Sequence, residues 1–508
     1  MRFDLSVPSQ LTAALTPDLL LVGGAMLLLL WAAWRPESDE HQRRIGVASI
    51  ALCLLTAGAV IWFEVRDVTA GPGVIAVDSF RWTADLLFLL ATVITLALAL
   101  DYNRRERLFV AEAHVLLLLA TSGMMLLAAA RDLMVVFLGI ELMSVSVYVL
   151  AGFNRRSAKA AESALKYFLL GAFSTGFLLY GMALVYGATG ATGFAEIGRS
   201  IAASGTAGNP MLLIGMALLL VGLGFKVAAV PFHMYTPDVY EGAPTPYTAY
   251  MAAAVKAGAF AAFLRIWLEA FPAGVGSWHL AVWWLAVITM VVGNVVALAQ
   301  KNIKRLLAYS SIAHAGYILV GVVVGTPAGT SAFVFYLVAY TLATMGAFAV
   351  VIALGQAGED NLELDDYAGL WRARPGMAVA MAVFMLALLG FPIVGGMGFF
   401  AKWLILDAAL SAPSPQTILA VVVVLTSVVS AGYYLAVIMY MFMRPRAEGA
   451  PGPAAVPGLT RFVIGAAVAV LLVFGIFPDP IVTLARNSAL TGATSTAAAA
   501  SSDDVAPR

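Results

Sequence analysis

Four lysines lie inside long apolar stretches of the sequence, where a charged side chain is costly. They are Lys166, Lys226, Lys256 and Lys402, and Glu141 has a similar setting in "FLGIELMSVSVY". Arginine stays protonated in proteins, whereas a buried lysine can lose its proton. Ionisable side chains in such stretches are candidates for function. The chemistry that these residue types suggest is reversible proton transfer.

Depth separates these candidates. Glu141 lies about ten residues into its stretch, roughly 15 Å along a helix and near the middle of a bilayer. Lys256 is similarly deep in "YMAAAVKAGAF". Lys166 lies near the end of its stretch, at i+4 from Glu162, so it could instead extend to the surface. For every member of the set, the alternative to proton transfer is a buried structural ion pair.

Two histidines could join such a path. His233 follows Pro231, and His314 lies in "AYSSIAHAGY". Histidine can relay protons near neutral pH, and the alternative is a neutral, hydrogen-bonded structural role. The hydroxyl groups of nearby residues could hold water around them: Tyr235, Ser310, Ser311 and Tyr317.

The composition places these residues in a membrane protein. Of 508 residues, 62% are hydrophobic and 11% are charged, against about 45–50% and about 25% in soluble domains. The formal net charge of zero implies no nucleic-acid partner. The one cysteine, Cys53, excludes a disulfide framework, a multi-cysteine zinc site and an iron–sulfur cluster in this chain.

Fourteen apolar stretches are long enough to cross a bilayer as helices, which predicts an all-α polytopic membrane protein. Strands are disfavoured because the stretches are long and lack alternation. The expected spans are 18–34, 45–63, 82–100, 112–130, 132–153, 162–186, 210–235, 246–270, 278–299, 305–325, 330–355, 376–407, 416–443 and 462–478.

The basic residues orient these spans. One set of alternate loops holds 17 Lys and Arg, and the other set, with both termini, holds eight, including Arg81, Arg131 and Arg265. The first set is therefore expected in the cytoplasm and both termini outside. On this count no arginine is left in the interior. Asp85 and Asp407 lie near span ends and are expected at the membrane interface.

Two stretches are too long for one straight helix, and both contain a helix breaker. The stretch 210–242 holds Lys226 and Pro231, and the stretch 376–410 holds Lys402 and a break from Pro392 to Gly398. In lipid, such breaks are tolerated where they line a cavity, and transporters place them in matching positions of inverted repeats. Each broken helix is fourth in a group of five, and five is odd, so we expect two inverted five-helix units. The predicted divisions are a three-helix segment (1–111), a first unit (112–270), a second unit (278–443), and a last helix with a disordered tail (444–508).

Several motifs resemble one family. They are "FLGIELMSVSVYVLAGF", "ESALKYFLLGAFSTGFLLYG", "GFKVAAVPFHMYTPDVYEGAPTP", "IKRLLAYSSIAHAGY" and "FPIVGGMGFFAKW". Together they resemble the antiporter-like membrane subunits of bacterial proton-pumping NADH:quinone oxidoreductase, respiratory complex I. The resemblance covers nearly the whole chain. Among the three paralogous members, Lys402 on the twelfth helix and the short segment after the last span favour the one nearest the quinone module.

The resemblance implies a translocase subunit with fourteen helices and two inverted units. It also implies a central polar axis of Glu141, Lys226, Lys256 and Lys402, with Lys166 and His233 beside it. NADH, FMN, iron–sulfur clusters and quinone would bind in partner subunits and none of them in this chain. Expected partners are other complex I membrane subunits, including a paralogous antiporter-like subunit and small helical subunits, in the bacterial inner membrane.

Two alternatives to this function remain open at the level of the sequence. One is a subunit of an Mrp-type cation/proton antiporter, which the same motifs would also fit. The other is a structural spacer of a larger membrane complex, in which the buried charges form inert ion pairs.

Overall fold

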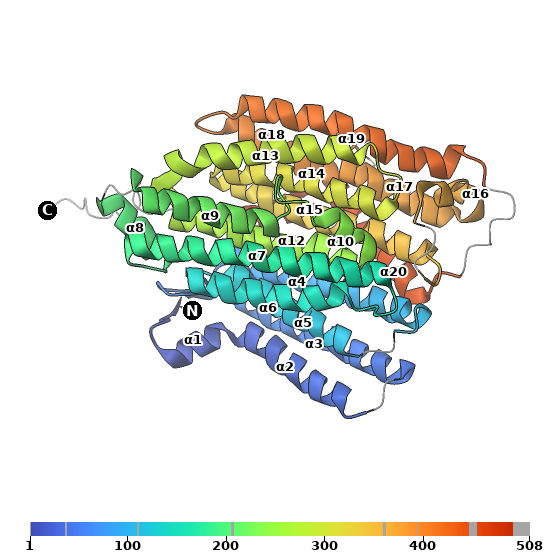
Figure 1. The fold of residues 1–508 in the computed structure, drawn as a ribbon, viewed down its shortest axis with the longest axis horizontal. Coiled ribbons are helices and arrows are strands. Elements are labelled where there is room, and N and C mark those ends of the chain that lie inside the picture. Colours follow the sequence, from blue (N-terminus) through green and yellow to red (C-terminus); the bar gives the residue numbers. More distant parts are fainter. Residues whose placement is uncertain are drawn as a thin grey trace.

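The computed structural model describes residues 2–35, 38–108, 111–204, 208–358, 362–393, 395–446 and 455–490. The predicted disordered tail lies mostly outside these residues. Long helices run side by side along one direction (Figure 1). One continuous apolar core joins them. The predicted all-α fold is confirmed, with one short parallel strand pair, β1 (Arg2–Phe3) and β2 (Thr69–Ala70).

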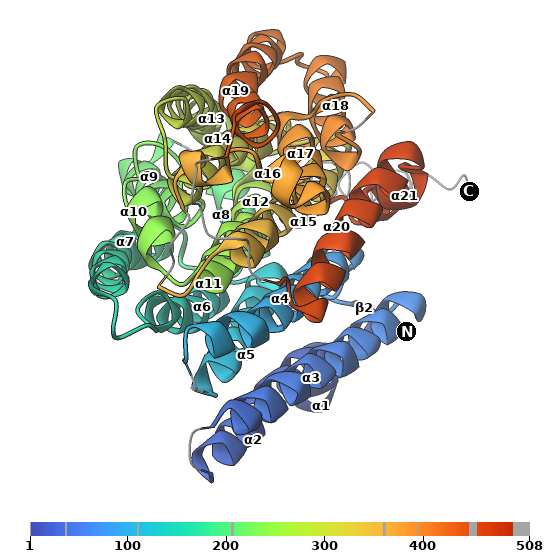
Figure 2. The same ribbon diagram turned by 90° about the vertical axis from the view of Figure 1, so that its right-hand side faces the viewer.

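The N-terminal segment consists of four helices. Figure 2 shows α2 and α3 as a pair at one edge of the molecule, next to α4 and α5. Asp78 caps α4 by accepting a hydrogen bond from the Arg81 backbone nitrogen (2.9 Å), which satisfies one of the free donors at a helix start. The bounds are α1 (Pro8–Ala14), α2 (Thr16–Ala33), α3 (Asp39–Val65) and α4 (Ser79–Arg105).

The first group of five predicted spans begins with α5. Its last member is one continuous helix over 245–270, fully surrounded by the others and containing π-helical turns at Met251–Val255 and Ile266–Ala270. Its helices are α5 (Glu112–Ala129), α6 (Leu133–Ala151), α7 (Ala158–Thr189), α8 (Phe194–Ser204), α9 (Pro210–Lys226), α10 (Thr236–Gly242), α11 (Thr245–Tyr250) and α12 (Lys256–Arg265).

The second group follows the same order and includes a 3₁₀ turn at Leu364–Tyr367. Its helices are α13 (Val275–Ala297), α14 (Ile303–Val324), α15 (Pro327–Leu354), α16 (Leu370–Ala373), α17 (Pro375–Leu389), α18 (Met397–Ser411) and α19 (Thr417–Met443). The chain then forms α20 (Gly458–Ile476) and α21 (Asp479–Asn487). A 3₁₀ turn at Pro272–Gly274 links the two groups.

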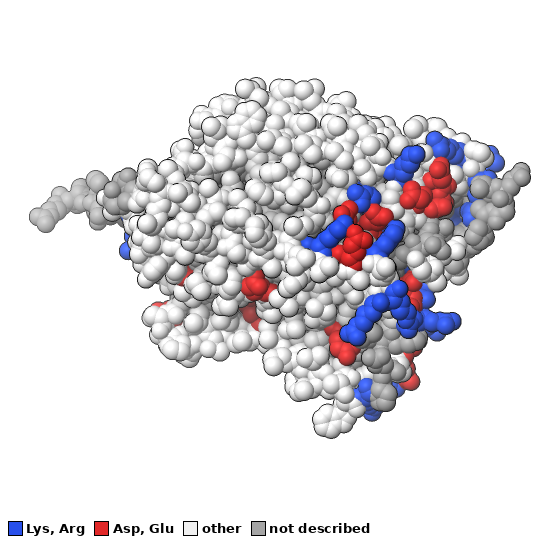
Figure 3. All heavy atoms as spheres, in the orientation of Figure 1, with Lys and Arg blue, Asp and Glu red and all other residues white. Residues whose placement is uncertain are grey.

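Twelve helices in the described part of the chain are long and apolar enough to cross a membrane, and each matches a predicted span. The other two predicted spans, 210–235 and 376–407, are the interrupted helices α9–α10 and α17–α18. The full count of fourteen crossings and the inverted relation of the two groups stay predictions. Charged side chains on the face in Figure 3 gather at one end, over α10 and α16, and the flank is mostly uncharged.

The first interruption begins at once after Lys226, five residues before Pro231. Its backbone groups find partners within the protein: the Val230 nitrogen donates to Thr289 Oγ1 on α13 (3.0 Å), and the Tyr235 hydroxyl donates to the Phe225 carbonyl (3.1 Å). These groups are therefore satisfied within the protein, as they must be where lipid offers no hydrogen bonds.

Two predictions about buried charge were wrong. Arg81 and Arg265, counted as loop residues, are fully buried, and so is Asp85, expected at the interface. All three lie close to helix ends, but neighbouring helices cover those ends. Asp407 is exposed, as its expected interfacial position requires.

Candidate functional site

Lys226 occupies the last position of α9, where the positive end of its side chain complements the helix dipole. The side chain is buried, 7% exposed. Its Nζ donates to the Ser144 hydroxyl (2.8 Å) and the Tyr148 hydroxyl (3.1 Å), both on α6. Lys226 Nζ also lies 5.5 Å from the centre of the Tyr148 ring, within range of a cation–π contact. The ammonium is thus held by neutral oxygens and an aromatic face.

Glu141 lies on the same face of α6, because Glu141, Ser144 and Tyr148 follow an i, i+3, i+7 spacing. Its carboxylate accepts a hydrogen bond from Thr175 Oγ1 on α7 (3.1 Å). Among the described residues, no ion pair joins Glu141 to Lys226. The structure therefore has Glu141 on the same face of α6 as the two hydroxyls that hold Lys226 of α9, about one helical turn before Ser144.

Aromatic side chains enclose the Lys226 end of α9. The Tyr148 and Tyr167 rings are 4.7 Å apart, Tyr167 and Tyr235 stack at 5.0 Å, and Tyr235 stacks on Phe225 at 4.2 Å. These rings come from α6, α7 and both sides of the helix interruption. They fix the interruption in place and surround Lys226 with apolar surface.

Lys256 begins α12 directly after a π-helical turn, a feature that is frequent at functional sites. It is 2% exposed. Its Nζ donates to the Ser311 carbonyl (2.8 Å) and is also bonded to the Ser311 hydroxyl on α14. Lys256 therefore connects the last helix of the first group with the second helix of the second group.

His314 lies three residues after Ser311 on α14 and is 3% exposed. Its Nδ1 contacts the Tyr336 hydroxyl (2.8 Å) and its Nε2 contacts the Tyr434 hydroxyl (3.1 Å). The Tyr434 hydroxyl is in turn bonded to Ser310. A hydroxyl can donate or accept, so either ring nitrogen can carry the proton. This arrangement suits a histidine that takes up a proton on one nitrogen and releases one from the other.

Lys402 lies on α18 just after the second interruption. Its Nζ donates to the carbonyl of Leu389, the last residue of α17 (2.8 Å), so the lysine satisfies a carbonyl that the interruption frees. The ammonium lies 4.7 Å from the centre of the Tyr317 ring, and that ring is 5.7 Å from the His314 ring. The Tyr317 ring thus lies between Lys402 and His314, and Ser311, the partner of Lys256, lies one helical turn before His314 on α14.

Lys166 lies apart from this buried set. Its side chain is 40% exposed and forms ion pairs of 2.7 Å with both Glu162 and Asp238. The predicted Glu162–Lys166 pair is confirmed. Arg305 joins the network through Asp238 (2.8 Å) and Glu241 (2.9 Å), and the group lines a cavity of about 220 Å³. Figure 3 displays charges of both signs side by side over α10.

Two acids of this surface network, Asp238 and Glu241, lie on α10, after the predicted span 210–235, and the third, Glu162, lies on α7. Burial alone would raise the pKa of Asp238, but hydrogen bonds and charges from Lys166 and Arg305 outweigh it and hold the pKa below its usual value. The pKa of Glu241 is lowered for the same reasons, with Arg305 and Lys159 as its partners. Both carboxylates therefore stay ionised at neutral pH.

His233 lies in the interruption between α9 and α10 and is partly buried. Its Nδ1 is buried and has no hydrogen-bond partner among the described residues. The described contacts do not join His233 to Lys226, Glu141 or His314.

Comparison with known proteins identifies the family of this chain. The family model described as "NADH:quinone oxidoreductase/Mrp antiporter, TM" matches residues 130–430. An NADH-quinone oxidoreductase subunit N from Gemmatimonas aurantiaca is 56% identical over 490 residues, covering 94% of this chain and 93% of its own length. The chain belongs to the subunit N family of NADH:quinone oxidoreductase.

Solved structures agree with this family. A chain of respiratory complex I from Thermus thermophilus superposes with a TM-score of 0.76 and 36% identity, covering 92% of this chain and 99% of that one. A chain of the Mrp complex from Dietzia has a TM-score of 0.78 at 21% identity, which shows a shared fold only. The resemblance to antiporter-like subunits is confirmed. This family agrees with the expectation from Lys402, which favoured subunit N among the three paralogous members.

In this member of the subunit N family, Ser311, which holds Lys256, was among the hydroxyls named from the sequence, but the hydroxyl partners of Lys226 were not. Ser144 and Tyr148 could have been found from their spacing to Glu141, because they follow it on one helix face. Tyr336 and Tyr434 come from α15 and α19, and no local pattern connects them to His314. In the described part of the chain, no group of three or more His, Cys, Asp or Glu side chains could hold a metal ion.

Proposed function

We propose that this chain translocates protons across the bacterial inner membrane as subunit N of NADH:quinone oxidoreductase. Protons move through Glu141, Lys226, Lys256, His314 and Lys402, with water between them. The observation that carries the proposal is the setting of Lys226, Lys256 and Lys402. All three are buried and held by hydroxyl and carbonyl oxygens, and in the described part of the chain none has a carboxylate within ion-pair distance. A lysine held in this way can release its proton without breaking a salt bridge.

Glu141 and Lys226 form a coupled pair in this proposal. When the ionised Glu141 approaches, it stabilises the protonated Lys226. When the two separate, Lys226 rests on Ser144 and Tyr148, and the uncompensated buried charge favours loss of the proton. Moving between these partners requires about one helical turn along α6, which is within the reach of a lysine side chain.

The second half of the path runs from Lys256 through His314 to Lys402 near the outer exit. Its support is the contact of Lys256 with Ser311, the position of His314 one turn away, and the Tyr317 ring between His314 and Lys402. The interrupted helices supply polar backbone groups in the interior. Lys166 and His233 have accessory roles, with Lys166 at the cytoplasmic surface.

Electron transfer takes place in other subunits of the complex, which hold NADH, FMN, iron–sulfur clusters and quinone. Proton movement in this chain is coupled to quinone reduction there. Its partners are other membrane subunits of the complex, including a paralogous antiporter-like subunit and small helical subunits. Both termini lie on the outer side of the membrane.

The test is to substitute these residues and to measure proton pumping by complexes that still assemble. Lys226→Ala and Glu141→Ala should each strongly reduce proton pumping by the purified complex in proteoliposomes. Lys166→Ala should have a smaller effect, because Lys166 is exposed and paired at the surface. If the first two variants assembled and pumped at the wild-type rate, the buried charges would be a structural spacer and the proposal would be wrong.

A further inference from the structure

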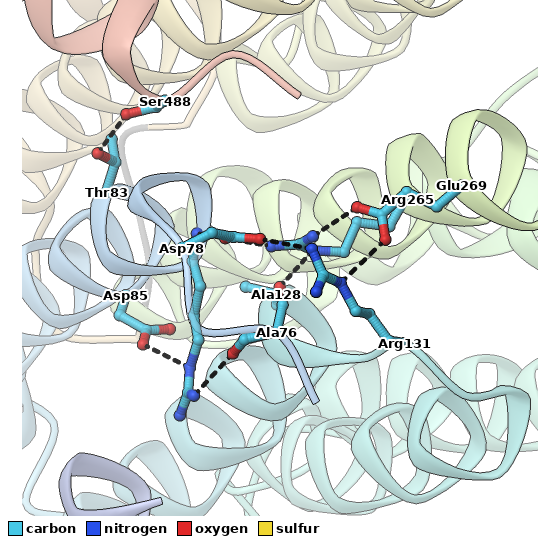
Figure 4. Close-up of polar contacts among 10 residues, drawn as sticks. Ala76, Asp78, Thr83, Asp85, Ala128, Arg131, Arg265, Glu269 and Ser488 are labelled. Carbon is cyan, nitrogen blue, oxygen red and sulfur yellow. Dashed lines mark hydrogen bonds and ion pairs between the residues drawn. The ribbon is translucent and has the colours of Figure 1, made fainter. Parts of the chain in front are cut away.

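Charged side chains from four parts of the chain meet where α4 begins, and Figure 4 labels Asp78, Asp85, Arg131, Arg265 and Glu269. Two of the arginines, Arg81 and Arg265, are fully buried, which is costly unless both are paired. The ion pairs divide the group into two parts, and only in the second part do the positive and negative charges differ in number. The members are Asp18, Asp78, Arg81, Asp85, Arg131, Arg265 and Glu269.

The first part is a closed ring of four side chains. Arg265 pairs with Asp78 (2.6 Å) and Glu269 (2.6 Å), and Arg131 pairs with the same two acids (3.3 and 3.2 Å). Burial would raise the pKa of Asp78, but the charges of Arg265 and Arg131 outweigh it and hold that pKa below its usual value. Two positive and two negative charges balance, so this ring needs no added proton.

The second part is a triad of one arginine and two acids. The Arg81 guanidinium is bonded to the Asp18 carboxylate on α2, and its Nε lies 3.6 Å from Asp85 Oδ2, one turn along α4. The Arg81 Nη1 donates to the carbonyls of Ala14 (3.3 Å) and Ala76 (3.0 Å). With both acids ionised, the triad would carry one uncompensated negative charge.

Asp85 is the member least suited to carry that charge. Its side chain is 0% exposed, and neither carboxyl oxygen has a hydrogen-bond partner among the described residues. Asp18, by contrast, is directly bonded to Arg81 and is 11% exposed. The remaining charges that act on Asp85 belong to the balanced ring, namely Arg265 and Asp78. On α3, Glu64 faces the Asp78 side of the group. A buried carboxylate without hydrogen bonds is costly, so the neutral acid is favoured.

We propose that the Asp18–Arg81–Asp85 triad is a second proton-binding site of this chain, with the proton on Asp85. The site is separate from the lysines. Lys256 begins α12, and Arg265 lies nine residues further along that helix, about 14 Å away. Arg265 pairs with Asp78, which caps α4. The triad near the start of α4 therefore lies at the end of α12 that is opposite Lys256. Its role as a group that holds protons before release to the outer side rests on the proposed function.

The direct test is infrared spectroscopy of the assembled complex at rest. A neutral carboxylic acid has a carbonyl band that shifts in D₂O, and a carboxylate lacks this band. The wild-type spectrum should contain one more such acid than that of Asp85→Asn, which should assemble because asparagine has the shape of a neutral aspartic acid. Asp18→Asn should also lose the band, because Asp85 then becomes the only counter-charge for Arg81. Asp407→Asn is the control, since Asp407 is exposed and should not contribute.

Two results would overturn the inference. One is an Asp85→Asn spectrum equal to that of the wild type in the acid region, which would mean that Asp85 is ionised and the triad is purely structural. The other is failure of Asp85→Asn to assemble, which would mean that the charge on Asp85 is needed. Neither measurement requires the complex to oxidise NADH or to pump protons. The band should persist in Lys226→Ala, so failure of the proposed function and failure of this inference can be told apart.

Discussion

The hydroxyl groups that hold Lys226 give the sharpest prediction. Ser144→Ala removes the shorter of its two hydrogen bonds (2.8 Å), and Tyr148→Phe removes the longer (3.1 Å) while keeping the ring near the ammonium. A hydrogen bond to a charged group contributes about 1.5–3 kcal/mol, which corresponds to about 10- to 100-fold in an equilibrium. The protonated state of Lys226 should therefore become scarcer by that factor.

The assay is the initial rate of proton pumping per complex in proteoliposomes supplied with NADH and quinone. Ser144→Ala should lower this rate by about tenfold or more, with a smaller loss for Tyr148→Phe. Ser146→Ala is the matched control, because Ser146 lies on the same helix, is buried, and donates only to the Leu142 carbonyl (2.9 Å). Equal pumping by Ser144→Ala and Ser146→Ala would refute the role given to the hydroxyl.

Three further predictions concern stability and geometry. Arg265→Leu should destabilise the subunit by about 3–5 kcal/mol, because two partly buried acids lose their fully buried partner. Arg199→Leu, at an exposed pair, should cost less than about 1 kcal/mol. Thermal unfolding of the complex measures both effects. Gly390→Ala should reduce pumping, because Gly390 has φ +76° and a Cβ there would lie 2.8 Å from Lys402 Cδ; normal pumping by an assembled variant would contradict it. Because the pKa of Asp238 is lower in the folded protein, its ionised carboxylate adds stability above its unfolded pKa of about 4. That stability is lost as the pH falls through the folded pKa. Asp238→Asn removes this contribution, so the free energy of unfolding should depend less on pH on the acid side.

Much of the fold follows from the lengths of the apolar stretches. About 20 apolar residues are needed to cross a bilayer, so stretches such as 132–153 and 330–355 could be placed from the sequence. The first interruption was predicted from Pro231, but it begins at Val227, because tertiary partners such as Thr289 hold the backbone there. The position of a partner on another helix leaves no local signal in the sequence.

In the candidate site too, the residue types could be predicted from the sequence but their contacts could not. Lys226, Lys256 and Lys402 stood out because a charge in an apolar stretch is rare. Which oxygen each lysine contacts depends on the rotation and packing of neighbouring helices, so the sequence did not assign Ser144 to Lys226.

The buried charges at the start of α4 were missed for a related reason. Arg81 and Asp85 lie within seven residues of the helix start, where sequence counting assigns them to a loop or an interface. Their burial comes from α2, which contributes Asp18 from far away in the chain.

The most direct test of proton transfer through Lys226 is Lys226→Arg in the assembled complex. Arginine keeps the positive charge and the hydrogen-bond donors but cannot release its proton. Measured as protons pumped per NADH oxidised in proteoliposomes, the variant should lose pumping to the same extent as Lys226→Ala. Wild-type pumping by Lys226→Arg would show that only the charge is needed, and would contradict transfer of a proton through this lysine.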